Sequence, residues 1–251
     1  MENRAVICTH HKAGTVWMAS TFKAVAEALG ISCIGIPARL PDGPVPFPVG
    51  IVRDIHSQWF AKGRYEPGDR FLHVIRDPRD IVISSMHYHR TSGEKWLHRP
   101  DELFGGQTYQ QALNSLPDDK ERLIFEMNHA SGKTINEMCS WPYGRGDCFE
   151  TKYETLLNNG DEEFGKAARH LGLRGKEIDF AVSAFLKNSL ADGARHKITS
   201  GIHIRSGAAE QWRTVYDREL KQAFTDRFPG ALSLLGYEPF SVDSTLPPDQ
   251  R

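Results

Sequence analysis

Short apolar runs alternate with longer amphipathic segments through the first third of the chain. Residues 4–9 (RAVICT) form a short run rich in apolar and β-branched side chains, which predicts a strand. Residues 15–29 carry apolar side chains at helical spacing and are followed by Gly30, which predicts a helix and its end. Further strands are expected at residues 32–36, 51–55 and 71–76.

Helical patterns dominate the remainder of the chain, with one more strand expected at residues 147–152 (DCFETK). Helices are expected at residues 109–116, 118–139, 153–158, 161–171, 177–190 and 217–228. The proline-rich stretch 37–48 and the polar stretch 190–215 lack periodicity and predict loops. Strands that alternate with helices form mostly parallel sheets flanked by helices. The sequence therefore predicts a single α/β domain over residues 1–251, with residues 240–251 as a flexible tail.

Composition places the chain among ordinary globular proteins, with 39% hydrophobic and 25% charged residues. Lys and Arg number 31 against 32 Asp and Glu, so any bound anion must be held by cations gathered locally. We expect no binding to nucleic acid on this ground. The four cysteines fit neither a zinc site nor a disulfide framework. A secretory signal and a membrane span are not recognisable in the sequence, so we expect a cytoplasmic protein.

The turn THHKAGTVW, between the first expected strand and helix, has the features of a phosphate site. A glycine-containing turn at a helix N-terminus gathers backbone N–H groups and the positive end of the helix dipole around one point. Lys12 adds a positive charge and Thr15 a hydroxyl. The lysine precedes Gly14 and the first glycine of G-x-x-x-x-G-K-[ST] is missing, so this is not a Walker A loop. For this turn alone, an ordinary loop with a solvated lysine is the alternative.

A second candidate is the segment VIRDPRDIVIS, which joins a strand to the next helix. Asp77 can cap that helix, Pro78 suits its first turn, and Asp80 lies where a capping box places an acceptor. Capping leaves Arg76 unexplained. An arginine at the carboxyl end of a strand in an open α/β sheet lies where such folds bind ligands, and its guanidinium fits phosphate oxygens. Ser84, within the helix, can add a hydroxyl.

Together these segments, K-x-G-T-x-W and R-D-P-R-D followed by a serine, resemble the phosphosulfate-binding signature of the sulfotransferase superfamily. The resemblance implies a P-loop NTPase-like sulfotransferase fold. It also implies a PAPS-dependent sulfotransferase, an enzyme that transfers a sulfuryl group from 3′-phosphoadenosine-5′-phosphosulfate (PAPS). The acceptor would be a hydroxyl or an amine, and the product 3′,5′-ADP (PAP) would be released. We call residues 9–17 the donor loop.

The resemblance also assigns residues to the two ends of the nucleotide. The 5′-phosphosulfate would be held by the donor loop, through Lys12, Ala13, Gly14, Thr15 and Val16. The 3′-phosphate would be bound by Arg76 and Ser84.

A C-terminal segment extends the match. Arg205, Ser206 and Gly207, followed by Trp212, resemble the R-K-G-x-x-G-D-W element that closes over the 3′-phosphate. Ser206 replaces a lysine, which removes a cation, and Glu210 replaces the second glycine, which changes the backbone geometry that the loop can adopt.

Three aromatic residues complete the expected adenine site. The resemblance places Trp17 beside the adenine, and Tyr153, in K-Y-E, at the position of a tyrosine that approaches the ring. Phe185 resembles an adenine-stacking phenylalanine.

The general base is expected at the end of the strand at residues 51–55. His56 falls on the histidine of the K-x-H strand end of the cytosolic branch, and an imidazole titrates near neutrality. Asp54 replaces the lysine of that motif and is the alternative base, as carboxylates are in the carbohydrate-directed branches. A histidine that is merely hydrogen-bonded at a strand end is a further interpretation of His56. With Lys12 expected to stabilise the departing 5′-phosphate, these residues are the catalytic candidates.

Other histidines fit a metal site poorly. His87 and His89, as H-x-H on a helix, would point to nearly opposite sides, and no carboxylate stands at ligand spacing. No metal is therefore expected. We expect His10 and His11 to line the donor loop, and His87 and His89 to line the acceptor cleft.

Two other functions remain open at this point: a P-loop kinase or NTPase, and a non-catalytic nucleotide-binding protein of the same fold. The acceptor is expected to be a small molecule, a glycan or a lipid-linked molecule, because acceptor pockets are built from variable loops that fold class does not fix. The oligomeric state is not predicted.

Overall fold

The computed structural model describes residues 3–36, 49–57, 65–189 and 208–241. At its centre lies a five-stranded sheet in the order β2-β3-β1-β4-β5, in which all neighbouring strands are parallel. The strands are β1 (Ala5–Cys8), β2 (Ser32–Gly35), β3 (Gly50–Asp54), β4 (Arg70–Ile75) and β5 (Cys148–Lys152). The α/β prediction is confirmed, and each strand coincides with a predicted segment to within one residue at its start.

The central strand β1 is buried over its whole length because both of its faces are covered. Ala5 and Ile7 belong to an apolar cluster on one face of the sheet. Val6 and Cys8 point to the other face, into a smaller cluster that includes Trp141. This alternation is the period of two expected for a strand.

Helices α1 (Thr15–Leu29), α7 (Tyr153–Asn158), α8 (Gly160–His170) and α9 (Lys176–Asn188) supply the first cluster. Phe22 of α1, Phe164 of α8 and Phe185 of α9 are fully buried within it. Gly30 ends α1 in the left-handed conformation, as the sequence predicted.

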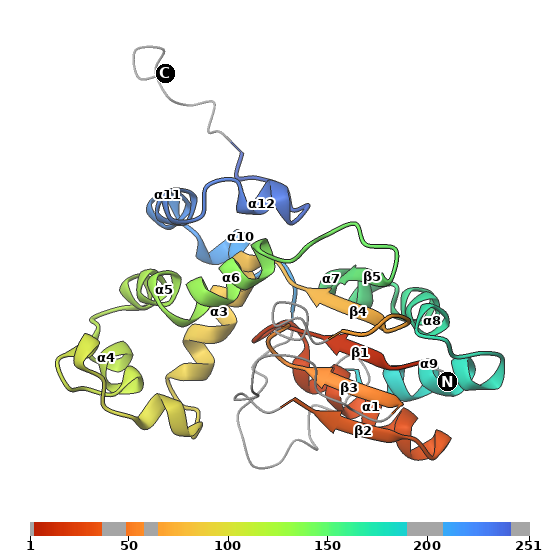
Figure 1. Ribbon diagram of the computed structural model, residues 1–251. Coiled ribbons are helices and arrows are strands. Elements are labelled where there is room, and N and C mark those ends of the chain that lie inside the picture. Colours follow the sequence, from red (N-terminus) through yellow and green to blue (C-terminus); the bar gives the residue numbers. More distant parts are fainter. Residues whose placement is uncertain (1–2, 37–48, 58–64, 190–207, 242–251) are drawn as a thin grey trace.

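A second group of helices lies beyond the carboxyl ends of the strands (Figure 1). Its apolar core is formed by residues of α3 (Pro78–His89), α5 (Asp119–Asn128), α6 (Ala130–Cys139), α10 (Trp212–Val215), α11 (Arg218–Arg227) and α12 (Ala231–Leu234). A small outer cluster joins the turns η1 (Lys95–His98) and η2 (Glu102–Phe104) to α4 (Tyr109–Ser115). The site described below lies where the two groups of helices meet the sheet.

Two predicted boundaries were wrong. The helix expected over residues 118–139 is two helices, because His129 leaves the helical region at φ −124° and ψ −112°. The second helix packs so closely on the first that a Cβ on Gly132 would lie 2.1 Å from the carbonyl oxygen of Met127. The stretch expected to be a loop up to residue 215 ends in the short helix α10, whose Trp212 is buried.

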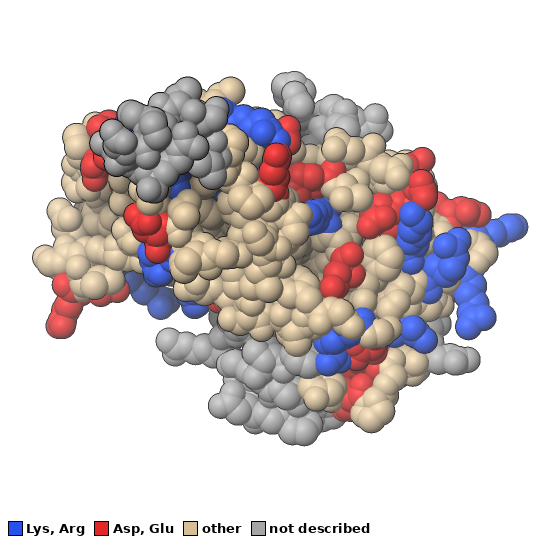
Figure 2. Space-filling view, turned by 90° about the horizontal axis from the view of Figure 1, so that it is seen from above, with Lys and Arg blue, Asp and Glu red and all other residues tan. Residues whose placement is uncertain are grey.

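The described C-terminal residues are packed onto the second group of helices. Phe240 contacts the rings of Trp212, Tyr216 and Phe224. Residues 242–251 of the predicted tail lie outside the described residues. Among the described residues, no helix combines the length and the apolar character that crossing a bilayer requires. Basic and acidic side chains are interspersed on the face shown in Figure 2, in keeping with the formal net charge of −1.

Candidate functional site

The donor loop connects the carboxyl end of β1 to the N-terminus of α1. Lys12 has φ 64° and Gly14 has φ 87°, so the chain passes through two left-handed positions before the helix begins. The Thr15 hydroxyl donates a 2.9 Å hydrogen bond to the carbonyl oxygen of His10 and braces the turn. Gly14 is the N-cap and offers no side-chain cap, so the first amides of α1 are directed toward the loop and suit an anion.

Arg76 joins three parts of the chain at this loop. Its guanidinium donates hydrogen bonds of 3.0 Å to the carbonyl oxygens of Lys12 and Ala208. It also lies 4.7 Å from the ring centroid of Tyr153, the first residue of α7. The side chain is buried, and Asp80 lies 4.0 Å away. Arg76, to which helix capping gave no role, is therefore the point where the donor loop, α7 and the C-terminal segment meet.

Lys12 is held in a cationic, poorly hydrated position. Its Nζ lies 3.9 Å from the ring centroid of Tyr88, near the end of α3. Burial, and then the positive charge of Arg76, lower the pKa of Lys12 to about 8, while Glu94 opposes the shift. Two cations that disfavour each other's charge in one buried place would both be stabilised by a bound anion.

Tyr153 packs directly on the donor loop. A Cβ on Gly14 would lie 3.1 Å from Cδ2 of Tyr153, so a side chain at this position would press on the ring. Trp17 is in edge-to-face contact with Tyr153 at 6.0 Å, and its indole N–H donates to the carbonyl oxygen of Phe185. Trp17 and Tyr153, the two residues expected beside the adenine, thus lie next to the donor loop, and both side chains are buried in the first apolar cluster.

Phe185 does not fit the adenine-stacking role. Its ring is stacked on Trp17 at 4.4 Å and on Phe164 at 4.2 Å, so both of its faces are covered. It belongs to the core of the first group of helices.

Three of the remaining nucleotide-binding candidates lie outside the described residues. These are Arg205, Ser206 and Gly207. Ser84 is half-buried on α3. In the donor loop, Ala13 is buried and Val16 is exposed.

The C-terminal segment that follows Gly207 is clamped onto the start of α3. The backbone N–H of Trp212 donates a 3.0 Å hydrogen bond to Asp80, which therefore serves this segment and not the capping box that the sequence suggested. Asp77 caps α3 by accepting the N–H of Arg79. The Arg79 guanidinium pairs with Asp77 and lies 3.5 Å from the ring centroid of Trp212. Burial raises the pKa of Asp80 to about 6, against the effect of Arg76.

The two candidate bases follow β3 directly. Asp54 is buried at the strand end, where its carbonyl oxygen accepts the N–H of Thr9 at 3.0 Å, and its carboxylate lies 3.4 Å from the backbone nitrogen of His56. Ser57 binds the carbonyl oxygen of Thr9 through its hydroxyl. The strand end carrying Asp54 and His56 is thus tied to the start of the donor loop.

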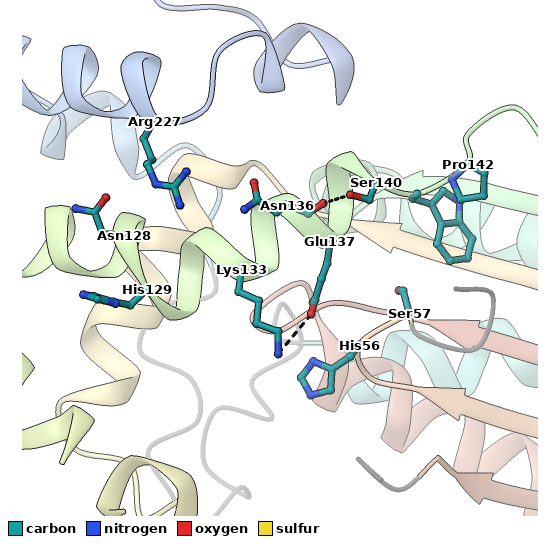
Figure 3. A pocket seen from close by; sticks show the side chains of 11 residues that line it. His56, Ser57, Asn128, His129, Lys133, Asn136, Glu137, Ser140, Pro142 and Arg227 are labelled. Atoms are coloured by element: carbon teal, nitrogen blue, oxygen red, sulfur yellow. Dashed lines mark hydrogen bonds and ion pairs between the residues drawn. The ribbon is translucent and has the colours of Figure 1, made fainter. Parts of the chain in front are cut away.

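His56 lines a pocket of about 750 Å³ between the end of β3 and helices α6 and α11. Lys133 and Glu137 of α6 point toward His56 across this pocket (Figure 3) and lie 3.9 Å from each other. Most of the residues that line it have polar side chains; the lining residues are His56, Ser57, Asn128, His129, Lys133, Asn136, Glu137, Ser140, Trp141, Pro142 and Arg227. These side chains can form hydrogen bonds with a bound ligand.

The side chains of His10 and His11 extend from the donor loop to different elements, and each contacts another histidine. His10 Nε2 lies 2.8 Å from Nε2 of His73 on β4, in a fully buried contact. His10 Nδ1 is 4.0 Å from the Glu137 carboxylate. Burial is the main cause that lowers the pKa values of His10 and His73.

His11 Nε2 lies 3.0 Å from Nε2 of His89, whose Nδ1 is 2.6 Å from the Glu126 carboxylate. His89 is fully buried in this chain of contacts and does not line an open cleft. Within the described residues, no group of three or more His, Cys, Asp or Glu side chains is arranged to hold a metal ion.

Sequence reasoning missed Glu126, Glu137, His73 and Tyr88. The sequence held a signal for Glu126. This residue lies three positions after Leu123 and next to Met127, on the face of its helix that is buried. A charged residue at a predicted core position indicates a buried partner. Nothing in the spacing connects Glu137 or His73 with the donor loop, since their elements meet it only in the folded chain.

Solved structures with this fold include two kinds of protein. Mouse sulfotransferase SULT7A1 complexed with PAP aligns with a TM-score of 0.58 at 15% identity, over 92% of this chain and 84% of that one. Retinol dehydratase in complex with androsterone and inactive cofactor PAP aligns with a TM-score of 0.53 at 14% identity, over 91% and 80%. Its complex with retinol and PAP gives 0.53 at 15% identity, over 97% and 83%. No family model and no curated protein matches the sequence. The likeness shows a shared fold.

Proposed function

We propose that this protein, which has the sulfotransferase fold, is a PAPS-dependent sulfotransferase that acts on a hydroxyl or an amine and releases 3′,5′-ADP. The observation that carries the proposal is the meeting of Lys12 and Arg76. These cations come from loops after two different strands, and Arg76 donates a 3.0 Å hydrogen bond to the Lys12 carbonyl oxygen. Binding sites of open α/β sheets lie at this end of the strands.

The chemistry of the residues fits a doubly phosphorylated nucleotide. Lys12, the first amides of α1 and the Thr15 hydroxyl would hold the 5′ end. Arg76 would take the 3′-phosphate, with Ser84 and the segment at Arg205, Ser206 and Gly207 as further candidates. The lowered pKa of Lys12 supports an anion at this place, because burial and then the neighbouring charge of Arg76 oppose its protonation in the free protein.

In the transfer step, the acceptor oxygen or nitrogen attacks sulfur while the bond from sulfur to the bridging oxygen breaks. The electron pair of that bond leaves with the 5′-phosphate, whose charge Lys12 and the loop amides would stabilise. The acceptor's proton passes to a base, for which His56 and Asp54 at the end of β3 are the candidates from the sequence. Asp54 and Ser57, the residues close to His56 on either side, are hydrogen-bonded to Thr9 of the donor loop.

The acceptor would enter through the pocket that His56 lines. Its amides, imidazoles and two cations support an acceptor rich in hydroxyl groups, such as a polar small molecule, a glycan or the head of a lipid-linked sugar. We also propose a cytoplasmic location, supported by the four cysteines, all of which are unpaired.

Calorimetry with PAP and with AMP, which lacks the 3′-phosphate, tests the nucleotide site. We expect PAP to bind more tightly than AMP by at least tenfold, the effect of one charge-assisted contact. Radiolabelled PAPS incubated with a panel of hydroxylated acceptors then tests transfer. Binding of PAP without transfer to any acceptor would favour a non-catalytic nucleotide-binding protein, and turnover of ATP with magnesium would favour a kinase or NTPase.

A further inference from the structure

The pocket at the end of β3 has two ends that differ in chemistry. His56 and Ser57 line the end next to the donor loop, where the Ser57 hydroxyl donates a hydrogen bond to the carbonyl oxygen of Thr9. Arg227, the last residue of α11, lines the same pocket and lies on the other side of α6 from His56 in the view of Figure 3. A molecule bound in this pocket can therefore contact the transfer site at one end and an arginine at the other.

The charged residues of the lining do not cancel. They include two side chains that are positively charged at neutral pH, Lys133 and Arg227, and one carboxylate, Glu137. Lys133 Nζ lies 3.9 Å from Oε1 of Glu137, and the other carboxylate oxygen lies 4.0 Å from Nδ1 of His10. Because Lys133 compensates the charge of Glu137, Arg227 is the net positive charge of the lining.

Arg227 makes no ion pair within the described residues. Its guanidinium carbon lies 5.2 Å from the ring centroid of Phe228, and the side chain is exposed. A guanidinium is more weakly hydrated than an ammonium group, and its donors form a planar fork that matches the oxygens of a carboxylate or a phosphate. The side chain is thus available to an acid group that enters the pocket.

Two amide side chains line the pocket together with this arginine. Asn128 ends α5 and Asn136 lies on α6, and Arg227 lies between them in the view of Figure 3. Neither amide side chain is hydrogen-bonded to another described residue, since the Ser140 hydroxyl uses the backbone oxygen of Asn136. An amide NH₂ can donate to an anionic oxygen, so the three side chains offer a set of donors without an acceptor.

His129 supplies a fixed wall and no charge. Its ring lies 4.3 Å from that of Phe125 and 5.1 Å from that of Phe104. Burial lowers the pKa of the His129 imidazole against the effect of Glu126, so the ring is neutral at pH 7. The positive charge at this end of the pocket therefore comes from Arg227.

We propose that the acceptor carries an acid group, such as a carboxylate, a sulfate or a phosphate, in addition to the group that is sulfated, and that Arg227 binds this acid group. Asn128 and Asn136 would add hydrogen bonds to it. Arg227 is then a specificity-determining residue, because it selects acidic acceptors and orients their other end toward His56. The proposal rests on the sulfotransferase function proposed above and narrows the class of acceptor.

Matched pairs of acceptors test the preference for an acid. Each pair consists of a hydroxylated acid and its neutral methyl ester: 4-hydroxyphenylacetate, methyl glucuronide and trigalacturonate. Transfer from radiolabelled PAPS is measured at a saturating donor concentration, so that an acid cannot compete for the donor loop. We expect at least one acid to react with a kcat/KM at least tenfold above that of its ester, the effect of one charge-assisted hydrogen bond.

Substitution of Arg227 tests which residue reads the acid group. Arg227→Gln should raise KM for the acid about 10- to 100-fold and change kcat by less than about threefold, because the contact is made equally in the ground state and the transition state. Transfer to the ester should not change, and Arg227→Lys should keep part of the preference. The control is Arg169→Gln, which removes an exposed arginine from α8, in the first group of helices.

A second variant should move the preference in the opposite direction. Glu137→Gln removes the one negative charge among the lining residues and leaves Lys133 uncompensated. The ratio of kcat/KM for acid over ester should therefore rise about two- to tenfold. A fall in that ratio would contradict the charge argument.

The outcomes distinguish this inference from the proposed function. Failure to bind PAP, or binding without transfer to any acceptor, contradicts the function, and the inference falls with it. Transfer to neutral acceptors with no preference for any acid overturns the inference and leaves the function in place. A preference for acids that survives in Arg227→Gln, or that Arg169→Gln reduces equally, overturns the assignment of the site to Arg227.

Discussion

The guanidinium of Arg76 donates a hydrogen bond of 3.0 Å to the carbonyl oxygen of Lys12, although the two residues follow different strands. Lys12 contacts residues at both ends of α3. Arg76 precedes the first turn of this helix, whereas the Lys12 side chain reaches Tyr88 near its end. The donor loop is therefore laid along α3 and held at both ends, which preorganises two cations for one ligand.

Replacing Arg76 by Ala should weaken PAP binding and leave AMP binding nearly unchanged. A charge-assisted hydrogen bond contributes about 1.5–3 kcal/mol, so the Kd for PAP should rise about 10- to 100-fold. Calorimetry with both nucleotides measures the difference. The matched control is Arg90→Ala, because Arg90 makes an exposed ion pair with Asp119 away from the loop. An equal loss for PAP and AMP would mean that Arg76 supports the loop but does not contact the 3′-phosphate.

Binding of PAP should take up protons above about pH 8. The pKa of Lys12 in the free protein is lowered to about 8, so part of the population is neutral at that pH. A bound phosphate favours the charged amine and raises this pKa, and the protein must then take a proton from the buffer. Calorimetry in two buffers of different ionisation enthalpy gives the number of protons. Lys12→Ala should abolish the uptake and lower kcat by about 10²- to 10³-fold.

The His10–His73 pair should make the fold sensitive to acid. Burial lowers both pKa values, whereas the unfolded chain protonates its histidines near the ordinary value of 6.5. Below that pH the unfolded state binds more protons, so the free energy of unfolding should fall as the pH falls. The Asp80 carboxyl, with its pKa raised to about 6, acts in the opposite direction.

The change of unfolding free energy with pH is compared between wild type and His73→Asn. Asp80 is present in both proteins, so the difference between them isolates the contribution of the histidine pair. Urea unfolding of wild type and His73→Asn between pH 7.5 and about 5 should give a smaller loss of stability for the variant. His98→Asn is the control, since the exposed His98 is hydrogen-bonded to the backbone oxygen of Ser92 at the surface. Equal slopes in all three proteins would contradict the prediction.

Gly132→Ala should destabilise the fold although alanine favours helices. The added Cβ would lie 2.1 Å from the carbonyl oxygen of Met127, where α6 packs on the end of α5. Backbone must move to relieve this contact, so we expect a loss of about 1–3 kcal/mol in the free energy of unfolding. In Gly165→Ala, the new Cβ meets only Val182 at 3.7 Å, and a gain of about 0.5–1 kcal/mol is expected. Chemical denaturation of both variants checks the difference.

Local chemistry made much of the fold predictable. The first four strands lie in short runs rich in apolar residues, Gly30 and Asp77 act at the helix ends where their residue types predict, and strand–helix alternation favours parallel pairing. The same rules fail between residues 118 and 139, because the periodicity continues through His129 although the backbone turns there. The break depends on close packing at Gly132, which no local pattern records.

The sequence by itself determined which groups could bind an anion: a lysine and a glycine before one helix, and an arginine before another. Only the tertiary structure decided which partners they have, because β1 and β4 are neighbours in the sheet and bring Lys12 and Arg76 together. It also decided which residues the adjacent histidines contact. His10 contacts His73 on β4, and His11 contacts His89, which in turn contacts Glu126. The physical reason is that hydrogen bonds and burial depend on distance in space, and residues as far apart in the sequence as Lys12 and Arg76, which are 64 positions apart, come into contact only when the chain has folded.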